Sequence, residues 1–188
     1  MVPKARPAAP LKMKMMKTKD LLQSALTSNQ FLTQMTEILD RPAEEFVNDN
    51  VIEELWAIKA FEHAEIYFNL LSSIDPKILR LTKFDDVIYK NFREQFPDLK
   101  VGLLREEELK SAQAKENWRP FCENYKLDVE DYNYGTLFRL DSSKEYSESN
   151  SVVVPRVQFL ALELARNREG FNDSIRENFK PKKLKTRS

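Results

Sequence analysis

The sequence predicts an α+β fold that is mainly α-helical: a compact helical domain around one central helix, a C-terminal two-stranded β-hairpin and disordered basic tails. Three observations predict it. Apolar residues recur at helical spacing over most of the chain. The period changes to alternation of side chains in residues 132–141. Both ends are rich in basic residues, and the first 19 residues contain no acidic side chain.

Composition restricts the class of protein. The chain has 188 residues, of which 41% are hydrophobic and 32% charged, and this predicts one soluble domain with tails. No apolar run approaches the roughly 18–20 residues that a membrane-spanning helix needs. The single cysteine, Cys122, excludes an intramolecular disulfide and a multi-thiolate zinc site, and the single histidine, His63, removes most metal sites and most histidine-based catalysis. We expect a cytoplasmic protein that binds neither a metal ion nor a membrane.

The charges are unevenly distributed although the net charge is zero. Residues 1–19 carry six basic side chains, and residues 176–188 carry six basic and one acidic. Removing these from the 30 of each sign leaves 18 basic and 29 acidic residues in the body, a net charge of −11. An acidic body is unsuited to specific DNA binding and suits a basic protein partner, although many soluble domains are simply acidic.

Residues 50–75 predict the central helix. Asn50 and Glu53 have the spacing of a capping box, and Pro76 ends the helix because the residue before a proline avoids the helical region. A second, narrower apolar row accompanies the main stripe, so we expect this helix to be covered on two sides. The main stripe contains Trp56, Ala57, Ala60, Phe61, Ala64, Tyr67, Phe68 and Leu71.

Two segments precede that helix. Residues 1–19 predict a disordered basic extension; they contain no secretory apolar core, and a mitochondrial presequence is the alternative. Residues 20–40 predict an additional helical segment, which packs on the core or binds a partner as an amphipathic helix. The predicted organisation is therefore 1–19 extension, 20–40 helical segment, 41–173 single globular domain and 174–188 disordered basic tail.

Short elements follow the central helix. Thr82 and Asp85 predict the start of a helix that Pro97 stops. Residues 99–104 are short and apolar, which predicts a strand or an extended connector. Residues 106–118 predict a helix with one side on the core, and Pro120 is expected to break or restart it.

The C-terminal part predicts a hairpin and a last helix. Residues 132–141 alternate as a strand, residues 142–150 form a polar loop, and the β-branched residues 151–154 return antiparallel. Pro155 suits the first position of the following helix, and Gly170 suits its C-terminal cap.

The chemistry of common enzymes is missing from the sequence. The three glycines lie more than thirty residues apart, whereas phosphate and dinucleotide loops need clustered glycines. There is no G-x-S-x-G elbow, and the paired carboxylates read as caps or solvated faces. We therefore expect neither catalytic residues nor a cofactor.

Arginine and aromatic residues concentrate in the second half of the chain. Arg166 falls between apolar residues of the last helix, where an unpaired charge is very costly. One interpretation is a structural network in which the arginines pair with Asp131, Asp141 and Glu163. The other is a partner-binding patch, since arginine, tyrosine and tryptophan dominate interface hot spots. The candidate residues are Trp118, Arg119, Tyr132, Tyr134, Arg139, Arg156, Arg166 and Arg168.

Five stretches resemble a known family, the eukaryotic polysaccharide-biosynthesis-domain-containing proteins. The family name comes from a domain label shared with plant xylan-biosynthesis and xylan methyltransferase proteins, yet this chain lacks a glycine-rich cofactor loop. The resemblance covers roughly residues 50–172. Its stretches are IEELWAIKAFEHAEIYFNLLSSIDP, LRLTKFDDVIY, EELKSAQAKENWRPFC, VEDYNYGTLFRLD and VPRVQFLALELARNREG.

The resemblance implies a dedicated cytosolic chaperone, not an enzyme. Its client is newly made translation elongation factor 1-alpha, whose GTP-binding domain it helps to fold near the ribosome. Ribosomal or nascent-chain-associated partners are also expected, through the basic tails. Two alternatives remain open at this point: a sugar- or methyl-transferase of polysaccharide biosynthesis, and a non-catalytic adaptor that uses the helical segment of residues 20–40.

Overall fold

The computed structural model describes residues 50–179. The chain divides into two compact units, Met1–Phe61 and Glu62–Ser188. Of the first unit, the structure describes only the beginning of helix α3 (Asn50–Ser73). The predictions for residues 1–19, 20–40 and 180–188, and for a domain start at residue 41, lie outside the described residues.

The predicted fold class is confirmed: the described part is mostly helical and contains one two-stranded antiparallel sheet. None of its helices is both long and apolar enough to span a bilayer. After α3 the elements are η2 (Pro76–Ile78), α4 (Asp85–Gln95), α5 (Glu106–Lys110), α6 (Ala112–Glu123), β1 (Gly135–Arg139), η3 (Glu148–Asn150), β2 (Ser151–Pro155), α7 (Arg156–Glu169) and α8 (Asp173–Asn178).

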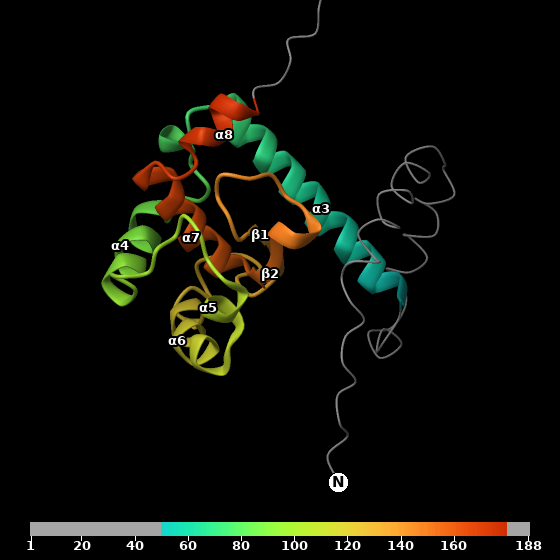
Figure 1. The fold of residues 1–188 in the computed structure, drawn as a ribbon. Coiled ribbons are helices and arrows are strands. Elements are labelled where there is room, and N and C mark those ends of the chain that lie inside the picture. The colour runs from blue at the N-terminus through green and yellow to red at the C-terminus, as the bar shows by residue number, and fades with distance from the viewer. Residues whose placement is uncertain (1–49, 180–188) are drawn as a thin grey trace, which may run out of the picture. The chain divides into compact units, whose positions relative to one another are not determined.

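The central helix is α7, and the prediction that residues 50–75 form it is wrong. Residues 157–167 of α7 are all buried, and the helix contacts α4, α6, η2 and both strands (Figure 1). By contrast, α3 exposes Glu62, Glu65 and Ile66 along one side. Periodicity misled here because α7 buries polar side chains as well as apolar ones, so it shows no single apolar stripe.

The hairpin confirms the predicted antiparallel pairing, with Gly135 opposite Pro155 and Arg139 opposite Ser151. Its long loop is closed by Asn150. The side-chain amide of Asn150 donates to the carbonyls of Asp141 (3.1 Å) and Glu145 (2.9 Å), and its oxygen accepts from the Asp141 N–H at 2.7 Å. Residues 99–104 form an extended connector, which joins the hairpin through an isolated bridge between Leu103 and Asp141.

Two helix boundaries differ from prediction. Helix α4 begins at Asp85; the Thr82 hydroxyl accepts from the Phe84 N–H, and the Asp85 carboxylate accepts from the N–H of Leu81 and Thr82. Ser111 divides the predicted helix of residues 106–118 into α5 and α6.

Pro120 does not break or restart the helix as predicted but lies inside α6. Its neighbours in the helix are held in an aromatic cluster: Trp118 stacks on Phe96 with ring centroids 4.3 Å apart and meets Phe121 edge to face at 5.6 Å. Tertiary packing of this kind outweighs the local cost of one missing backbone hydrogen bond.

The prediction that a disordered tail begins at residue 174 is wrong for its first residues. Helix α8 occupies Asp173–Asn178, and the side chain of Ile175 is fully buried. The ring of Phe179 packs edge to face on Phe68 with centroids 5.3 Å apart. A six-residue helix is too short to give a periodic signal in the sequence.

Candidate functional site

The eight predicted partner-binding residues do not form one surface. Trp118, Arg139 and Arg166 are buried. Tyr132 and Arg156 are half-buried, whereas Arg119, Tyr134 and Arg168 are exposed. The eight residues therefore fall into separate groups.

Arg139 and Arg166 belong to a buried charge cluster with Glu163, and all three side chains have 0% exposure. Arg166 Nη1 donates to Glu163 Oε1 at 2.9 Å, and Arg139 Nη2 lies 3.4 Å from Glu163 Oε2. Arg166 also donates to the carbonyls of Val101 at 2.7 Å and Leu140 at 3.0 Å. The two arginines thus tie the connector and the hairpin to α7.

Polar side chains add further hydrogen bonds to this cluster, although Nε of Arg139 has no partner among the described residues. Tyr67 donates its hydroxyl to Glu163 Oε2 at 2.9 Å, and Asn172 donates to the same oxygen at 2.9 Å. Asn172 Oδ1 accepts from Arg139 at 2.8 Å, and Asn167 Nδ2 donates to the Tyr67 hydroxyl at 3.2 Å. A buried network with so many partners specifies the arrangement of α3, β1 and α7.

The directions of the pKa shifts show which side chains of the cluster are charged. Burial alone would raise the pKa of Glu163, but the charges of Arg139 and Arg166 outweigh it and lower that pKa. Burial, followed by the neighbouring Glu163 carboxylate, raises the pKa of Tyr67 well above its ordinary value. Glu163 is therefore ionised and Tyr67 neutral at physiological pH.

The structural interpretation of the arginines is thus correct for two of them, and Arg139 and Arg166 are not available to a partner. Of the acidic partners predicted for the arginines, Glu163 is correct, whereas Asp141 pairs with Lys144 at 3.0 Å.

On the surface, Arg168 pairs with Asp86 at 2.7 Å. Arg156 lies near His63, and burial followed by the Arg156 charge lowers the pKa of that histidine.

Three of the predicted residues, Trp118, Arg119 and Tyr132, line one shared groove between α6 and β2, which encloses about 320 Å³. We call it the α6–β2 groove. Its floor includes Cys122, whose pKa burial raises to about 11, so the thiol is neutral and not activated as a nucleophile. The Tyr132 hydroxyl donates to Glu123 at 2.9 Å on the rim.

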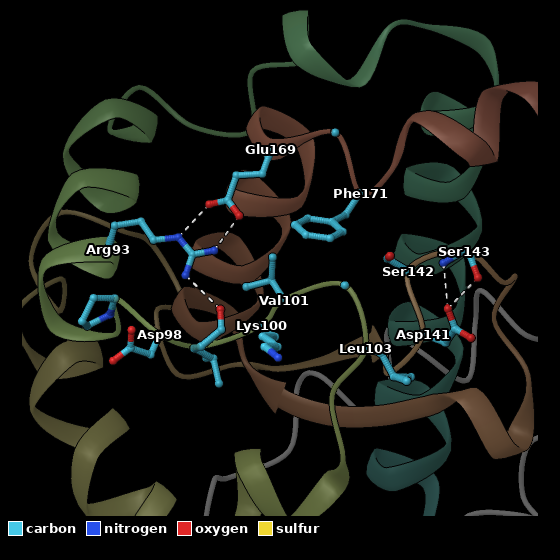
Figure 2. A pocket seen from close by; sticks show the side chains of 14 residues that line it. Arg93, Asp98, Lys100, Val101, Leu103, Asp141, Ser142, Ser143, Glu169 and Phe171 are labelled. Carbon is cyan, nitrogen blue, oxygen red and sulfur yellow. Dashed lines mark hydrogen bonds and ion pairs between the residues drawn. The ribbon is translucent and has the colours of Figure 1, made fainter.

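A larger and more open groove lies along the connector, at the ends of α4 and α7. We call it the connector groove; it encloses about 980 Å³ and is lined by residues 97–103, 141–143 and 169–171, with Arg93 (Figure 2). One wall is fixed by Arg93, which donates to both carboxylate oxygens of Glu169 at 2.6 Å and to the Leu99 carbonyl at 2.9 Å. Leu103 and Phe171 bring apolar side chains to it, exposed by 68% and 43%.

Glycine at position 102 allows Phe171 to lie against the connector. A Cβ atom at Gly102 would be 2.7 Å from Phe171 Cδ1, which is closer than real contacts allow. Sequence reasoning missed the connector groove entirely. The only sequence signal was an apolar residue, Phe171, directly after the C-terminal cap Gly170, a position that often contacts the preceding helix.

Among residues 50–179 no three histidine, cysteine or carboxylate side chains gather as metal ligands do. The connector groove presents apolar side chains beside mixed charges, and the α6–β2 groove presents basic side chains around an apolar floor.

Comparison with known proteins matches this chain over the same region. A family model described as "PBDC1 protein" covers residues 52–177. Protein PBDC1 of Mus musculus is 56% identical over 137 residues, which cover 73% of this chain and 69% of the mouse protein. Protein PBDC1 of Homo sapiens is 52% identical over 144 residues, which cover 77% of this chain but only 62% of the human protein.

The same relationship extends to yeast. The Saccharomyces cerevisiae PBDC1 homolog is 49% identical over 137 residues and is covered over 94% of its length. A solution NMR structure of a Saccharomyces cerevisiae protein superimposes with a TM-score of 0.66 at 46% identity, covering 73% of this chain and 97% of that one. The resemblance predicted from the sequence is confirmed, and the chain belongs to the PBDC1 protein family.

Proposed function

We propose that this protein is an ATP-independent, client-specific folding chaperone for newly synthesised translation elongation factor 1-alpha. It captures on its surface a folding intermediate of the client's GTP-binding domain, in the cytoplasm and close to the ribosome, and it works without catalysis. The family membership supports this proposal, since the chaperone role is what the family resemblance implies.

The observation that carries the proposal is the connector groove with its exposed apolar side chains. Leu103 and Phe171 are large apolar residues held at the surface, and apolar groups gathered at a groove mark interaction sites. The Arg93–Glu169 pair fixes the wall beside them, so the groove is preformed. A partly folded client exposes apolar surface that its native state buries, and this surface offers a matching contact.

Release follows from the same difference. A protein that binds the intermediate more tightly than the native state shields the intermediate while the client's apolar surface is exposed. It dissociates as folding buries that surface. When the client folds and binds GTP, the contact is lost and no ATP hydrolysis is required.

Affinity capture from cells, with and without translation arrest, tests the proposal. Elongation factor 1-alpha should be recovered mainly as newly made chains, and arrest should abolish most of that recovery. Leu103→Glu should reduce recovery at least several-fold. Leu127→Glu is the matched control, because Leu127 is 98% exposed and lies outside the connector groove. Equal recovery of mature and new chains, or no effect of Leu103→Glu, would count against the proposal.

The absence of catalysis has its own test. Calorimetric titration of the purified protein with S-adenosylmethionine and with nucleotide sugars should show no saturable heat. Clear saturable binding of either ligand would instead support the transferase alternative.

A further inference from the structure

The α6–β2 groove carries a second inference that does not depend on the proposed chaperone role. Among its lining residues is Gln158 of α7, whose side chain is 2% exposed. Its amide nitrogen Nε2 has no hydrogen-bond acceptor among the described residues. A buried donor without a partner costs free energy, so such a group at the floor of a groove indicates a missing acceptor.

The charge of the rim indicates what kind of acceptor it is. Lys110, Lys115 and Arg119 stand around the groove, against the single carboxylate of Glu123. Glu123 already accepts from Tyr132, and Lys110 is paired with Glu106 at 3.3 Å. Lys115 and Arg119 have no carboxylate within ion-pair distance in the described part of the chain, and one turn of α6 separates them.

The strand beside the groove indicates the shape of the ligand. In the described residues β2 pairs with β1 and with no other strand. The register turns the backbone of Val153 and Pro155 to its second edge, where Val153 offers an N–H and a C=O and Pro155 only a C=O. Val153 and Val154 both line the groove although their side chains point to opposite faces of the sheet. Val153 and Pro155, whose backbone groups point to the free edge of β2, both line the groove.

From these observations we infer that the α6–β2 groove binds an extended, acidic peptide segment of a partner protein. The segment lies along the edge of β2 as an added strand. Its carboxylates meet Lys115 and Arg119, one of its oxygens accepts from Gln158, and an apolar side chain packs on the floor formed by Trp118 and Cys122.

The test uses the full-length protein and a synthetic peptide in which glutamate alternates with valine between terminal serines. A second peptide has glutamine in place of every glutamate. In NMR titration the glutamate peptide should shift the amide resonances of β2, the side-chain amide of Gln158 and the indole N–H of Trp118. The glutamine peptide should bind at least tenfold more weakly, and added salt should weaken only the glutamate peptide.

Variants locate the site. The double variant Lys115→Glu/Arg119→Glu changes exposed side chains and should reduce affinity at least tenfold without loss of the fold. Lys126→Glu, an exposed lysine outside the groove, is the matched control and should leave affinity unchanged. Gln158→Leu should weaken binding several-fold; if that variant unfolds, Gln158→Met provides the same test with a more flexible side chain.

Three results would overturn the inference: equal affinity for the two peptides, unchanged affinity in the double variant, or no binding of the glutamate peptide at all. Tighter binding of a single-stranded oligouridine than of the glutamate peptide would also overturn it, because the groove would then serve a nucleic acid.

Discussion

Glu163 is the residue on which the interior of this domain depends. It is fully buried, yet it carries a negative charge because Arg139 and Arg166 flank it and Tyr67 and Asn172 donate to it. Taking such charges out of water is expensive, and their mutual attraction repays that cost only while all partners are present. Removing one member of the cluster therefore destabilises the fold by far more than the complete cluster stabilises it.

Glu163→Gln should lower the free energy of unfolding by about 3–5 kcal/mol, because it leaves two buried guanidinium groups without a counter-charge. Urea denaturation of the purified variant measures this. Asp86→Asn is the matched control, since it removes the surface ion pair with Arg168 and should cost less than about 1 kcal/mol. Similar losses in both variants would show that the buried cluster contributes no more than a surface pair.

The same carboxylate should make stability dependent on acid. The pKa of Glu163 is lower in the folded state than in the unfolded chain, where a glutamate titrates near about 4.3. Its contribution is thus fully present above that value and is lost as the pH falls through the lower folded pKa. Unfolding free energies measured from about pH 6 down to about pH 2 should fall more steeply for the natural protein than for Glu163→Gln. Parallel curves would contradict this assignment.

At the level of single residues, burial was harder to predict than pairing. The need for a partner at Arg166 followed from its place between apolar residues, and Glu163 was correctly named as an acidic partner. Nothing in the sequence indicated that Arg139 is buried, because an arginine on a hairpin strand is ordinarily solvated. Only the close approach of the hairpin to α7, a contact between distant parts of the chain, places it inside.

Among the elements, α7 and the connector decide the shape of the larger groove. Helix α7 ends at Gly170, which has a left-handed conformation with φ of 83°, as its predicted role of C-terminal cap requires. This reversal places Phe171 over Gly102 of the connector. The groove therefore exists because two glycines permit a sharp turn and a close approach at neighbouring places.

Gly102→Ala should remodel the connector groove with little loss of stability. The added methyl group would collide with the ring of Phe171, and this ring is exposed enough to turn outward. We expect a cost of about 1 kcal/mol in unfolding free energy and a several-fold loss in recovery of newly made elongation factor. Denaturation and the capture assay measure the two effects. A large loss of stability with normal recovery would mean that Phe171 is a structural residue and not part of the capture surface.

Local signals predicted elements well where the chain alone decides them. The hairpin and the stop at Gly170 both follow from neighbouring residues. They failed where packing decides: Pro120 remains helical because the aromatic cluster around Trp118 holds α6, and α8 is too short to be periodic. The central position of α7 was missed for the related reason that its buried polar residues look like a solvated face.

For the whole molecule, the sequence predicted the class of fold and the family but not the surface. The predicted patch combined side chains from the interior with side chains from separate faces. The sequence does not show which face of a helix packs against the core. Trp118, Arg119 and Tyr132 do meet at one groove. The connector groove was not predicted, since its walls come from parts of the chain as distant as Arg93 and Phe171.

The C-terminal limit of the domain gives a prediction on this scale. A chain that ends after Asp173 lacks Ile175, which is fully buried, and Phe179, which packs on Phe68. Burial of one such aliphatic side chain contributes about 1.5–3 kcal/mol, so this truncation should lower the unfolding free energy by at least about 2 kcal/mol. A chain that ends after Phe179 should match the full-length protein, because the sequence predicts a disordered lysine-rich tail beyond it. Ile175→Ala in the full chain should reproduce most of the loss, which separates packing by α8 from an effect of the tail's charge. If the two truncated chains are equally stable in urea, α8 contributes nothing to the domain and the boundary predicted at residue 173 is correct after all.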